Sequence, residues 1–520
     1  MRPARCCAPS RLCNDLELLM RFSFSPRSSR GAVMGFTWSQ IVMVSLGVLC
    51  AVTAVNLGVS GARWTAAALA VVAAVLWVLG LLRLRGRRAT AWLPVITGAL
   101  IQRAARQDRY RGLVFAPNGA AGHLDLPGPA AGYRWLPAVA ADGTTHVGLL
   151  AHAGERTVTA ALRCHGSNFL LADTEVQEQR LVDWAQVLNI LGSEYGDLGL
   201  ARWSLTTRVV PDTGNRAQRY LAGRAVDTTS PAYESLAELT AAAGPSAQRH
   251  ETFLAVVFDA ARMSGEVADA GGGDAAVAAV VLDKLTGIEA TVAEAGVPTD
   301  GWLSPRGYAA VLRSQFDPAD QAELGLRGAG PGVAAGVAPR LAGPAATETV
   351  GWSVLRHDSG YSRTLWVAEM PRTLVGATWL TGLYTRVTGR RTVTLVAQPI
   401  PAALANLAAR REQVARAGDE LAKRKLRLVR TAREQQEARS VAQIDREQAQ
   451  GHVRYRYALL VTITATTIDG LEQDTRTVKR ILARAGCEAV VLFGEQDQAF
   501  AAEALPLGRG LAPIRGWWAA

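Results

Sequence analysis

Two long stretches without a charged residue, both near the N-terminus, constrain this 520-residue chain more than any other feature. The first begins at Ile41 and ends at Leu57, and the second begins at Trp64 and ends at Leu82. With its flanking residues, each reaches the roughly 20 apolar residues that a helix needs to cross a bilayer. The few residues between them leave room only for a turn. We therefore predict a transmembrane hairpin over residues 34–88, rather than a buried helical pair or a cleaved signal peptide.

The positive charge of the chain lies beside these stretches. The formal net charge is +11, of which six arginines against two carboxylates in residues 1–33 give +4 and eight arginines against Asp108 in residues 83–111 give +7. The turn carries only Arg63, so the positive-inside rule places both termini in the cytoplasm. The sequence thus predicts a multi-pass protein of the inner membrane. Because the rest of the chain is close to neutral, direct binding to nucleic acid is not expected.

Residues 1–33 form a basic leader, and Met34 offers a second start site that would leave this leader untranslated. Three of the six cysteines lie in the leader, and Cys50 lies in the first apolar stretch. Only Cys164 and Cys487 remain for the rest of the chain. No disulfide framework or zinc site can be built from them, which fits a reducing compartment.

The region after the hairpin alternates between strand-like and helix-like patterns. Three strand–helix–strand segments are expected, over residues 157–210, 364–398 and 458–493, and a strand followed by a helix over residues 252–295 begins another. The segment over residues 364–398 has its helix at residues 376–388. The strands alternate in polarity, which favours a mixed or antiparallel sheet with helices on one face over a doubly wound sheet. The predicted fold class is therefore membrane-anchored α+β, with repeated β-α-β units of the ferredoxin-like type.

Two segments interrupt this pattern and set the predicted domain boundaries. Residues 326–347 are rich in Gly, Ala and Pro and read as a linker between α+β regions at residues 89–325 and 348–520. Residues 401–450 form a highly charged helical insertion in the second region. Apolar residues recur in it every seven positions, as in a short coiled-coil seam: Leu407, Val414, Leu421 and Leu428. A solvated helical hairpin packed on its own domain is the favoured interpretation, and a partner-docking helix is the alternative.

Signatures of catalysis are absent from the sequence. It has no Gly-rich phosphate loop ending in Lys-Ser/Thr, no His-Glu-x-x-His metal helix and no Gly-x-Ser-x-Gly nucleophile turn. We therefore predict no catalytic, cofactor-binding or metal-binding residues and no enzyme activity. His357 and Asp358, near Tyr361 and Arg363, form the most concentrated polar cluster. A loop that caps the following strand explains this cluster better than a catalytic pair, although an enzyme with an unrecognised site remains an alternative.

Two motifs carry a resemblance to a known family. One is the Arg-His-Asp-Ser segment that contains His357 and Asp358, followed by Trp366. The other is a Gln-x-x-Ala-Phe element leading to Leu-Pro-Leu-Gly, here Gln496, Phe500, Leu505, Pro506, Leu507 and Gly508. With the hairpin, they resemble an actinobacterial family of integral membrane proteins from conjugative-element transfer regions. The C-terminal region also resembles the non-catalytic N-terminal region of type IV secretion ATPases, and the chain stops where the motor domain of those ATPases would follow.

This resemblance implies a function without catalysis. It implies an inner-membrane scaffold component of a type IV secretion or conjugative DNA-transfer apparatus that recruits a separate ATPase. The implied partners are the membrane, this secretion ATPase and other transfer-apparatus membrane proteins, and such a scaffold can also form an oligomer. The alternative is a membrane component of a type VII export system, against which the Leu-Pro-Leu-Gly ending argues.

Overall fold

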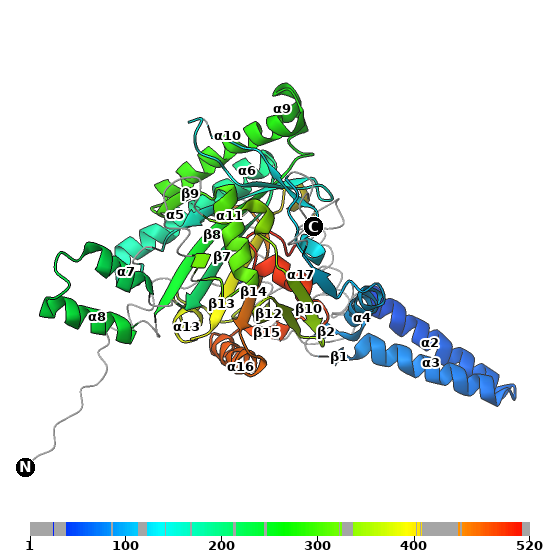
Figure 1. Ribbon diagram of the computed structural model, residues 1–520. Coiled ribbons are helices and arrows are strands. Elements are labelled where there is room, and N and C mark those ends of the chain that lie inside the picture. The colour runs from blue at the N-terminus through cyan, green and yellow to red at the C-terminus, as the bar shows by residue number, and fades with distance from the viewer. Residues whose placement is uncertain are drawn as a thin grey trace, which may run out of the picture. The chain divides into compact units, whose positions relative to one another are not determined.

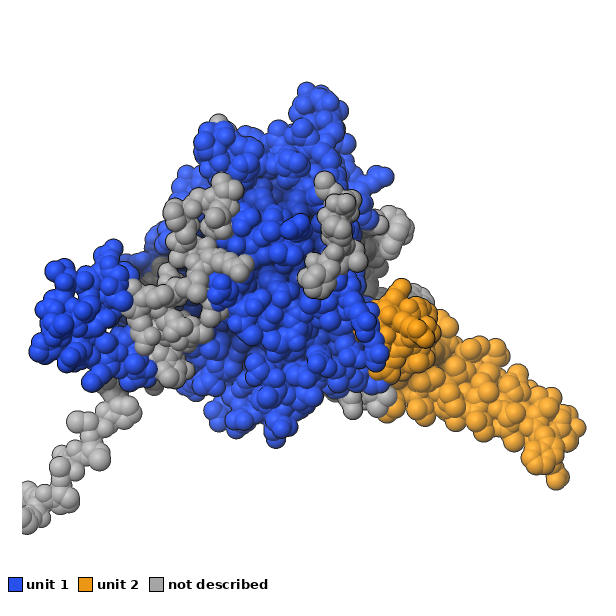
Figure 2. Space-filling view, viewed as in Figure 1, with its two compact units in different colours: residues 1–24, 109–402, 452–519 blue, residues 25–108, 403–451, 520 orange. Residues whose placement is uncertain are grey.

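A computed structural model describes residues 24, 38–84, 87–112, 122–140, 142–166, 169–211, 215–243, 247–321, 323–324, 336–401, 403–405, 407, 446–447 and 450–511. It divides the chain into two compact units, coloured separately in Figure 2. Unit 1 comprises residues 1–24, 109–402 and 452–519, and unit 2 comprises residues 25–108, 403–451 and 520.

Unit 2 contains the apolar hairpin. Its first helix is α2 (Trp38–Val59) and its second is α3 (Arg63–Leu81), and they run antiparallel, since the Gln40 side chain donates to the Gly80 carbonyl oxygen. A short β-ribbon follows, formed by β1 (Arg83–Leu84) and β2 (Arg87–Arg88), and then helix α4 (Ala89–Ala104). In the described part of the chain, α2 and α3 are the two helices long and apolar enough to cross a membrane. The predicted pair of apolar helices is confirmed.

Unit 1 is built on one 13-stranded sheet, in which every pairing between the described strands is antiparallel (Figure 1). The strand order is β3-β10-β11-β12-β14-β13-β7-β8-β6-β5-β4, while β15 pairs with β12 and β9 with β6. The outer strands are β3 (Arg109–Arg111), β4 (Tyr133–Leu136), β5 (Leu149–His152), β10 (Ala346–Val350) and β11 (Val354–His357). The α+β fold with an antiparallel sheet agrees with the sequence prediction.

Two segments of unit 1 have the same order of elements. The first is β6 (Thr157–Cys164), α5 (Thr174–Gly192), β7 (Leu200–Pro211), β8 (Gln248–Asp259), α10 (Gly273–Glu294) and β9 (Thr299–Trp302). The second is β12 (Gly360–Glu369), α13 (Thr381–Thr385), β13 (Arg390–Pro399), β14 (Tyr455–Ala465), α16 (Ile468–Arg484) and β15 (Glu488–Val491). Along the sheet they read β9-β6-β8-β7 and β15-β12-β14-β13. In each, the third strand therefore separates the two strands of the first β-α-β unit.

The two segments join edge to edge. Strands β7 and β13 pair with Leu205 opposite Leu395 and Thr206 opposite Thr394. Leu395 packs against the core under α5 and α10 and also against the core under α13 and α16. Because side chains along a strand alternate between faces, these four helices cover the same face of the continuous sheet.

The start, the buried side and the end of helix α16 each follow from particular residues. Thr467 caps its N-terminus by accepting a hydrogen bond from the Gly470 amide at 3.2 Å. Its buried residues recur at helical spacing and face the sheet: Leu471, Thr475, Val478 and Leu482. Gly486, with φ of +80°, follows the helix end, where a left-handed residue commonly terminates a helix.

The opposite face of the sheet is covered as well. Helices α11 (Pro305–Phe316) and α17 (Gln496–Glu503) pack there on Phe253, Ala255 and Ala161. The prediction of helices on one face only is therefore wrong. The central strands are buried on both sides, as the neighbours Phe253 and Leu254 of β8 show with 0% exposure each, and both sides need a cover.

The remaining helices and turns of unit 1 are short or lie outside the two repeated segments. They are α6 (Glu194–Asp197), α7 (Asn215–Arg224), α8 (Pro231–Ala243), α9 (Ser264–Asp269), and the 3-10 turns η1 (Gly128–Ala130), η2 (Phe169–Leu171) and η5 (Pro339–Leu341). The expected helix over residues 376–388 is shorter than predicted, because α13 spans only Thr381–Thr385. Gly and Thr, which are frequent in this stretch, are poor helix formers.

Candidate functional site

The outer surface of the α2–α3 hairpin is predominantly apolar and carries no charged residue between Ile41 and Leu57 or between Trp64 and Leu81. On α2 the exposed large side chains are Val42, Leu46, Val48, Leu49, Val52, Val55 and Val59. On α3 they are Trp64, Val71, Val72, Val75, Trp77, Val78 and Leu81. A contiguous apolar surface of this size is not stable in water, because each such side chain gains roughly 1.5–3 kcal/mol on leaving it. The hairpin therefore needs an apolar environment.

Small residues form the seam between these helices. Gly47 and Ala54 of α2 and Ala73 and Gly80 of α3 are buried, seven positions apart within each helix. A β-carbon at Gly47 would lie 2.6 Å from the Trp77 ring, so only glycine lets that ring approach. Small residues at close helix contacts are typical of helices packed within membranes, where backbones approach closely.

His357, from the first sequence motif, lies at the end of β11 and is fully buried. Its Nδ1 lies 2.6 Å from the Phe316 carbonyl oxygen and its Nε2 lies 2.7 Å from the Ser362 hydroxyl, which in turn bonds to Thr464. Burial lowers the pKa of His357 to about 4, because a charged imidazolium would lose its hydration. A neutral ring with both nitrogens occupied joins α11 to the sheet.

Asp358 turns away from this histidine. Its φ of +26° places it in the turn between β11 and β12. Its carboxylate accepts the backbone amides of Ala345 and Ala346 at 3.2 and 2.9 Å and pairs with Arg313 Nη1 at 2.9 Å. His357 and Asp358 thus bond to different partners, and the geometry gives them no shared catalytic role.

Gln496, from the second motif, continues the sheet with its side chain. Its Oε1 accepts the Thr364 amide at 2.8 Å, and its Nε2 donates to the Thr364 carbonyl oxygen at 3.2 Å. Strand β15 pairs with β12 up to Val491 opposite Leu365. The amide of Gln496 therefore takes the place of the next strand residue and fixes the start of α17 on the sheet.

The rest of the second motif is buried beneath α11. Leu505 and Leu507 belong to the core on that side, and the Tyr308 hydroxyl donates to the Pro506 carbonyl oxygen at 2.5 Å. Gly508 has φ of +60°, and a β-carbon there would lie 2.4 Å from Val257 Cγ2. Only glycine satisfies both conditions, which explains its place at the end of the motif.

The structure brings the two motifs together. The His357 ring lies 5.1 Å from the Phe500 ring, and Phe500 lies 5.4 Å from Phe316, between ring centroids. We call the buried group of His357, Phe316, Phe500, Ser362 and Thr464 the motif centre. It has no exposed chemistry, because His357, Ser362 and Phe500 are each at most 2% exposed and the histidine nitrogens are occupied.

Sequence reasoning missed a buried polar layer around this centre. Thr206 bonds to Thr394 at 3.0 Å, Thr394 donates to the Glu503 carbonyl oxygen at 2.7 Å, and Thr364 bonds to Thr462 at 2.6 Å. The alternating threonines of β13 and β14 look like a solvent-facing side in the sequence. Helix α17 covers them instead, and their hydroxyls satisfy one another.

Glu503, the last residue of α17, is fully buried against this threonine layer. Neither carboxyl oxygen makes a well-formed hydrogen bond. Burial raises the pKa of Glu503 to about 8, and neighbouring Thr462 offsets only part of that effect. The side chain is therefore protonated at neutral pH.

Buried arginines hold the end of α11. Arg208 Nη1 donates to the Val311 carbonyl oxygen at 3.2 Å and to Ser314 Oγ at 2.7 Å, and Arg390 donates to the Ser314 carbonyl oxygen. Glu251 pairs with Arg208, and although burial alone would raise the pKa of Glu251, the guanidinium lowers it to about 2. Cations at the last turn of a helix complement its free carbonyl groups.

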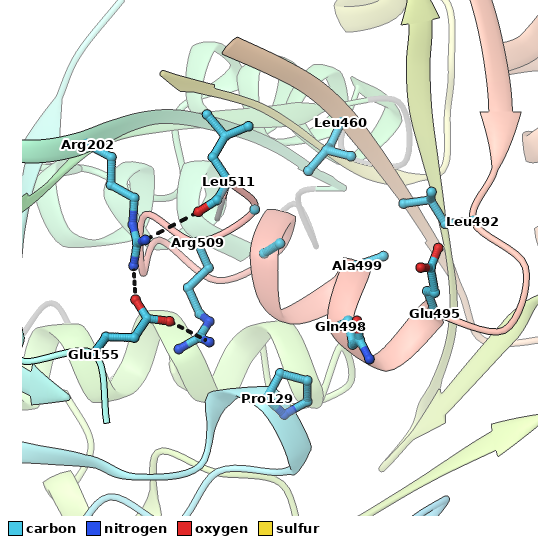
Figure 3. Close-up of a pocket in the computed structure, with 12 residues that line it drawn as sticks. Pro129, Glu155, Arg202, Leu460, Leu492, Glu495, Gln498, Ala499, Arg509 and Leu511 are labelled. Atoms are coloured by element: carbon cyan, nitrogen blue, oxygen red, sulfur yellow. Dashed lines mark hydrogen bonds and ion pairs between the residues drawn. The ribbon is translucent and has the colours of Figure 1, made fainter. Parts of the chain in front are cut away.

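A pocket of about 320 Å³ opens beside α17 and the segment that follows it (Figure 3). In Figure 3 the Glu155 carboxylate lies between the guanidinium groups of Arg202 and Arg509, and Arg509 Nη2 is 3.0 Å from Glu155 Oε1. Burial alone would raise the pKa of Glu155, but these arginines bring it below its ordinary value. With Glu495 also on the wall, the charges of the pocket balance, which favours no anion or cation.

Metal and thiol chemistry find little support in the described residues. No group of three or more His, Cys, Asp or Glu side chains among them could hold a metal ion. Burial raises the pKa of the Cys164 thiol to about 12 and that of Cys487 to about 11, so neither forms a reactive thiolate at neutral pH. His165, next to Cys164, pairs with Asp300 at 2.6 Å on the exposed side of the chain.

Most of the predicted partner seam lies outside the described residues. Leu407 is described, in a helical conformation and 37% exposed, whereas Val414, Leu421 and Leu428 are not. The seam therefore stays a prediction.

No protein-family model matches the chain, and no curated protein matches it either. The resemblance to conjugative-transfer membrane proteins therefore rests on the sequence motifs alone.

Because His357 is buried and neutral, the folded protein should lose stability as the pH falls. Between pH 7 and pH 5 the unfolded chain protonates this histidine, whose ordinary pKa is about 6.5, while the folded protein does not until about pH 4. We expect the wild type to lose about 2 kcal/mol of unfolding free energy at this group over that interval. His357→Gln removes the titration, so its deficit relative to wild type should shrink by that amount in denaturant unfolding of the detergent-solubilised protein. His146→Gln, at an exposed histidine, is the matched control, and an equal shrinkage there would contradict the assignment.

Burial of Glu503 should make the protein less stable as the pH rises, which is opposite to the effect of His357. The pKa of Glu503 is about 8 in the folded protein, whereas its ordinary value is 4.5. The unfolded chain therefore loses this proton first, and the free energy of unfolding falls progressively as the pH rises from 4.5 to 8. The advantage of Glu503→Gln over wild type should therefore grow by about 2.5 kcal/mol between pH 5 and pH 7. Glu238→Gln, on the exposed side of α8, should show no such growth. A pH-independent effect of Glu503→Gln in the same unfolding assay would show that the carboxyl is ionised in the folded protein.

Proposed function

We propose that this protein is an inner-membrane scaffold component of a type IV secretion or conjugative DNA-transfer apparatus, and that it recruits a separate ATPase. The observation that carries the proposal is the apolar outer surface of the α2–α3 hairpin, joined in one chain to a large folded region. Helices this long and apolar match the thickness of a bilayer.

The orientation follows from charge. Arginines are concentrated before α2 and after α3, and the turn between the helices carries only Arg63. By the positive-inside rule, both termini and unit 1 lie in the cytoplasm. That is the side on which an ATPase finds its nucleotide.

The motif centre gives the two family motifs a structural meaning. Residues 132 positions apart, Thr364 and Gln496, are bonded through the sheet, and the motif residues are buried. In this proposal the motifs build a rigid platform, and partners bind elsewhere on its surface. In this proposal the central part of unit 1 contains two ferredoxin-like repeats, which are joined through β7 and β13. Their shared strand order supports an internal duplication.

No observation favours the alternatives to the same degree. An enzyme built on His357 and Asp358 would need the two groups to meet at an accessible position, and they bond to different partners in the interior. Nothing in the geometry points to a type VII export system rather than to conjugative transfer. The proteins that co-purify with this chain distinguish the two.

The membrane topology is the first prediction of this proposal. In a variant with Cys50 and the leader cysteines replaced, Ser60→Cys in the turn should react in intact cells with a thiol reagent that does not cross the inner membrane. Thr144→Cys, on an exposed loop of unit 1, should react only after lysis, because it lies in the cytoplasm. Mass spectrometry of the labelled peptides gives the readout. Labelling of both sites, or of neither, in intact cells would contradict the hairpin.

Partner recovery is the second prediction. The tagged protein, purified from its native membrane in mild detergent, should retain a type IV secretion ATPase, identified by mass spectrometry. Thr144→Cys, a substitution at an exposed position, serves as a second bait that should retain the same partner. Recovery of type VII components would replace the proposal by its rival, and a solitary protein under conditions that preserve either complex would remove the scaffold role.

A further inference from the structure

Helix α4, which follows the hairpin in unit 2, presents its apolar side outward. Leu93, Ile96, Leu100 and Ile101 are 44%, 40%, 55% and 67% exposed. The side chains of Ala89, Val95 and Ala99 face inward and are buried. A helix on the surface of a water-soluble protein has apolar residues inward and polar residues outward, whereas these described residues of α4 are apolar on both sides.

The composition of α4 excludes a third membrane crossing. Residues 89–102 carry no charge, a run of 14 positions, whereas a crossing needs about 20. Pro94 lies inside the helix, and Thr97 on the outward side donates its hydroxyl to the Leu93 carbonyl oxygen at 2.9 Å. The Thr97 hydroxyl is thus satisfied within the helix, which lowers the cost of placing it in an apolar environment. Apolar helices of this length are found buried in cores or at membrane interfaces.

Arginines precede and follow α4 in the sequence. Arg83, Arg85, Arg87 and Arg88 precede α4 in the sequence, and Arg103 and Arg106 are exposed at its C-terminal end. Asp108 is the only acidic residue between positions 83 and 111. The segments next to the helix in the sequence are therefore positively charged, and this charge is complementary to anionic lipid headgroups.

We propose that α4 is an interfacial helix that binds the anionic cytoplasmic leaflet. Its outward side, formed by Leu93, Ile96, Leu100 and Ile101, inserts at the boundary between headgroups and acyl chains, and the flanking arginines contact lipid phosphates. This inference rests on the proposed membrane placement of the hairpin, and it adds a second, peripheral contact with the same leaflet.

The test places a fluorophore on the full-length protein in lipid nanodiscs. Cys50 and the leader cysteines are replaced by alanine, while Cys164 and Cys487 stay, since burial keeps them unreactive. Single cysteines at Ile96, Leu100, Val75 or Val226 then carry an environment-sensitive dye. Val75 lies on the outer surface of the hairpin, and Val226 is a fully exposed control in unit 1.

The discs contain phosphatidylcholine with or without phosphatidylglycerol, and lipids with a nitroxide quencher near the headgroup or near the chain end. We expect dyes at Ile96 and Leu100 to be quenched by the shallow nitroxide, the dye at Val75 by the deep one, and that at Val226 by neither. In the discs without phosphatidylglycerol, quenching at Ile96 and Leu100 should fall by about twofold or more, and Arg103→Gln with Arg106→Gln should reproduce this loss.

Each other outcome has a distinct meaning. If Val75 is quenched while Ile96 and Leu100 report water, α4 is not interfacial, although the hairpin is in the membrane. If the dyes on α4 report an apolar environment but neither lipid nitroxide quenches them, the outward side of α4 binds protein, either a partner or a second copy. That result would overturn the inference. Equal quenching in both lipid mixtures would reject the binding of anionic headgroups. Absence of quenching at Val75 would reject the hairpin itself and the proposed function with it.

Discussion

The pairing of β7 with β13 is the constraint on which the rest of unit 1 depends. This ladder sets Leu205 opposite Leu395 and Thr206 opposite Thr394. Side chains along a strand alternate between faces, so a slip of one residue would exchange the two faces of one half relative to the other. The observed register gives one apolar face under α5, α10, α13 and α16, and one face whose threonines meet beneath α17.

Burial of these threonines also fixes the covering helix, because that helix must supply hydrogen-bonding groups for the sheet. Thr394 uses the carbonyl oxygen of Glu503, and Gln496 at the other end of α17 uses the backbone of Thr364. Both ends of this short helix are thereby tied to the sheet by polar contacts whose geometry is specific. A polar interior of this kind fixes one arrangement of the helix, whereas an apolar contact alone would allow it to slide.

The sequence predicted elements well where a local pattern was sufficient. The apolar hairpin, α16 and the strands near residues 157, 200, 364 and 458 follow from length and periodicity. It failed where a distant segment decides the environment. The threonines of β13 and β14 have the alternation of a solvent-facing strand, and only the position of α17, more than 30 residues further along the chain, makes that face buried. The burial of Glu503, the contact between His357 and Phe500, and the cover of α11 and α17 on the second face share this cause.

The ends of the central strands determine where this fold tolerates change. Strand β7 leaves the sheet after Pro211 and β8 enters it at the paired residue Gln248, while β13 leaves after Pro399 and β14 enters at its partner Tyr455. Because β7 and β13 are antiparallel, these two connections depart from opposite ends of the sheet. Each joins strand ends that the ladder already holds together, and doubling the length of such a loop costs only about 0.6 kcal/mol. Segments could therefore be gained or lost at both places during evolution while the sheet between them stays the same.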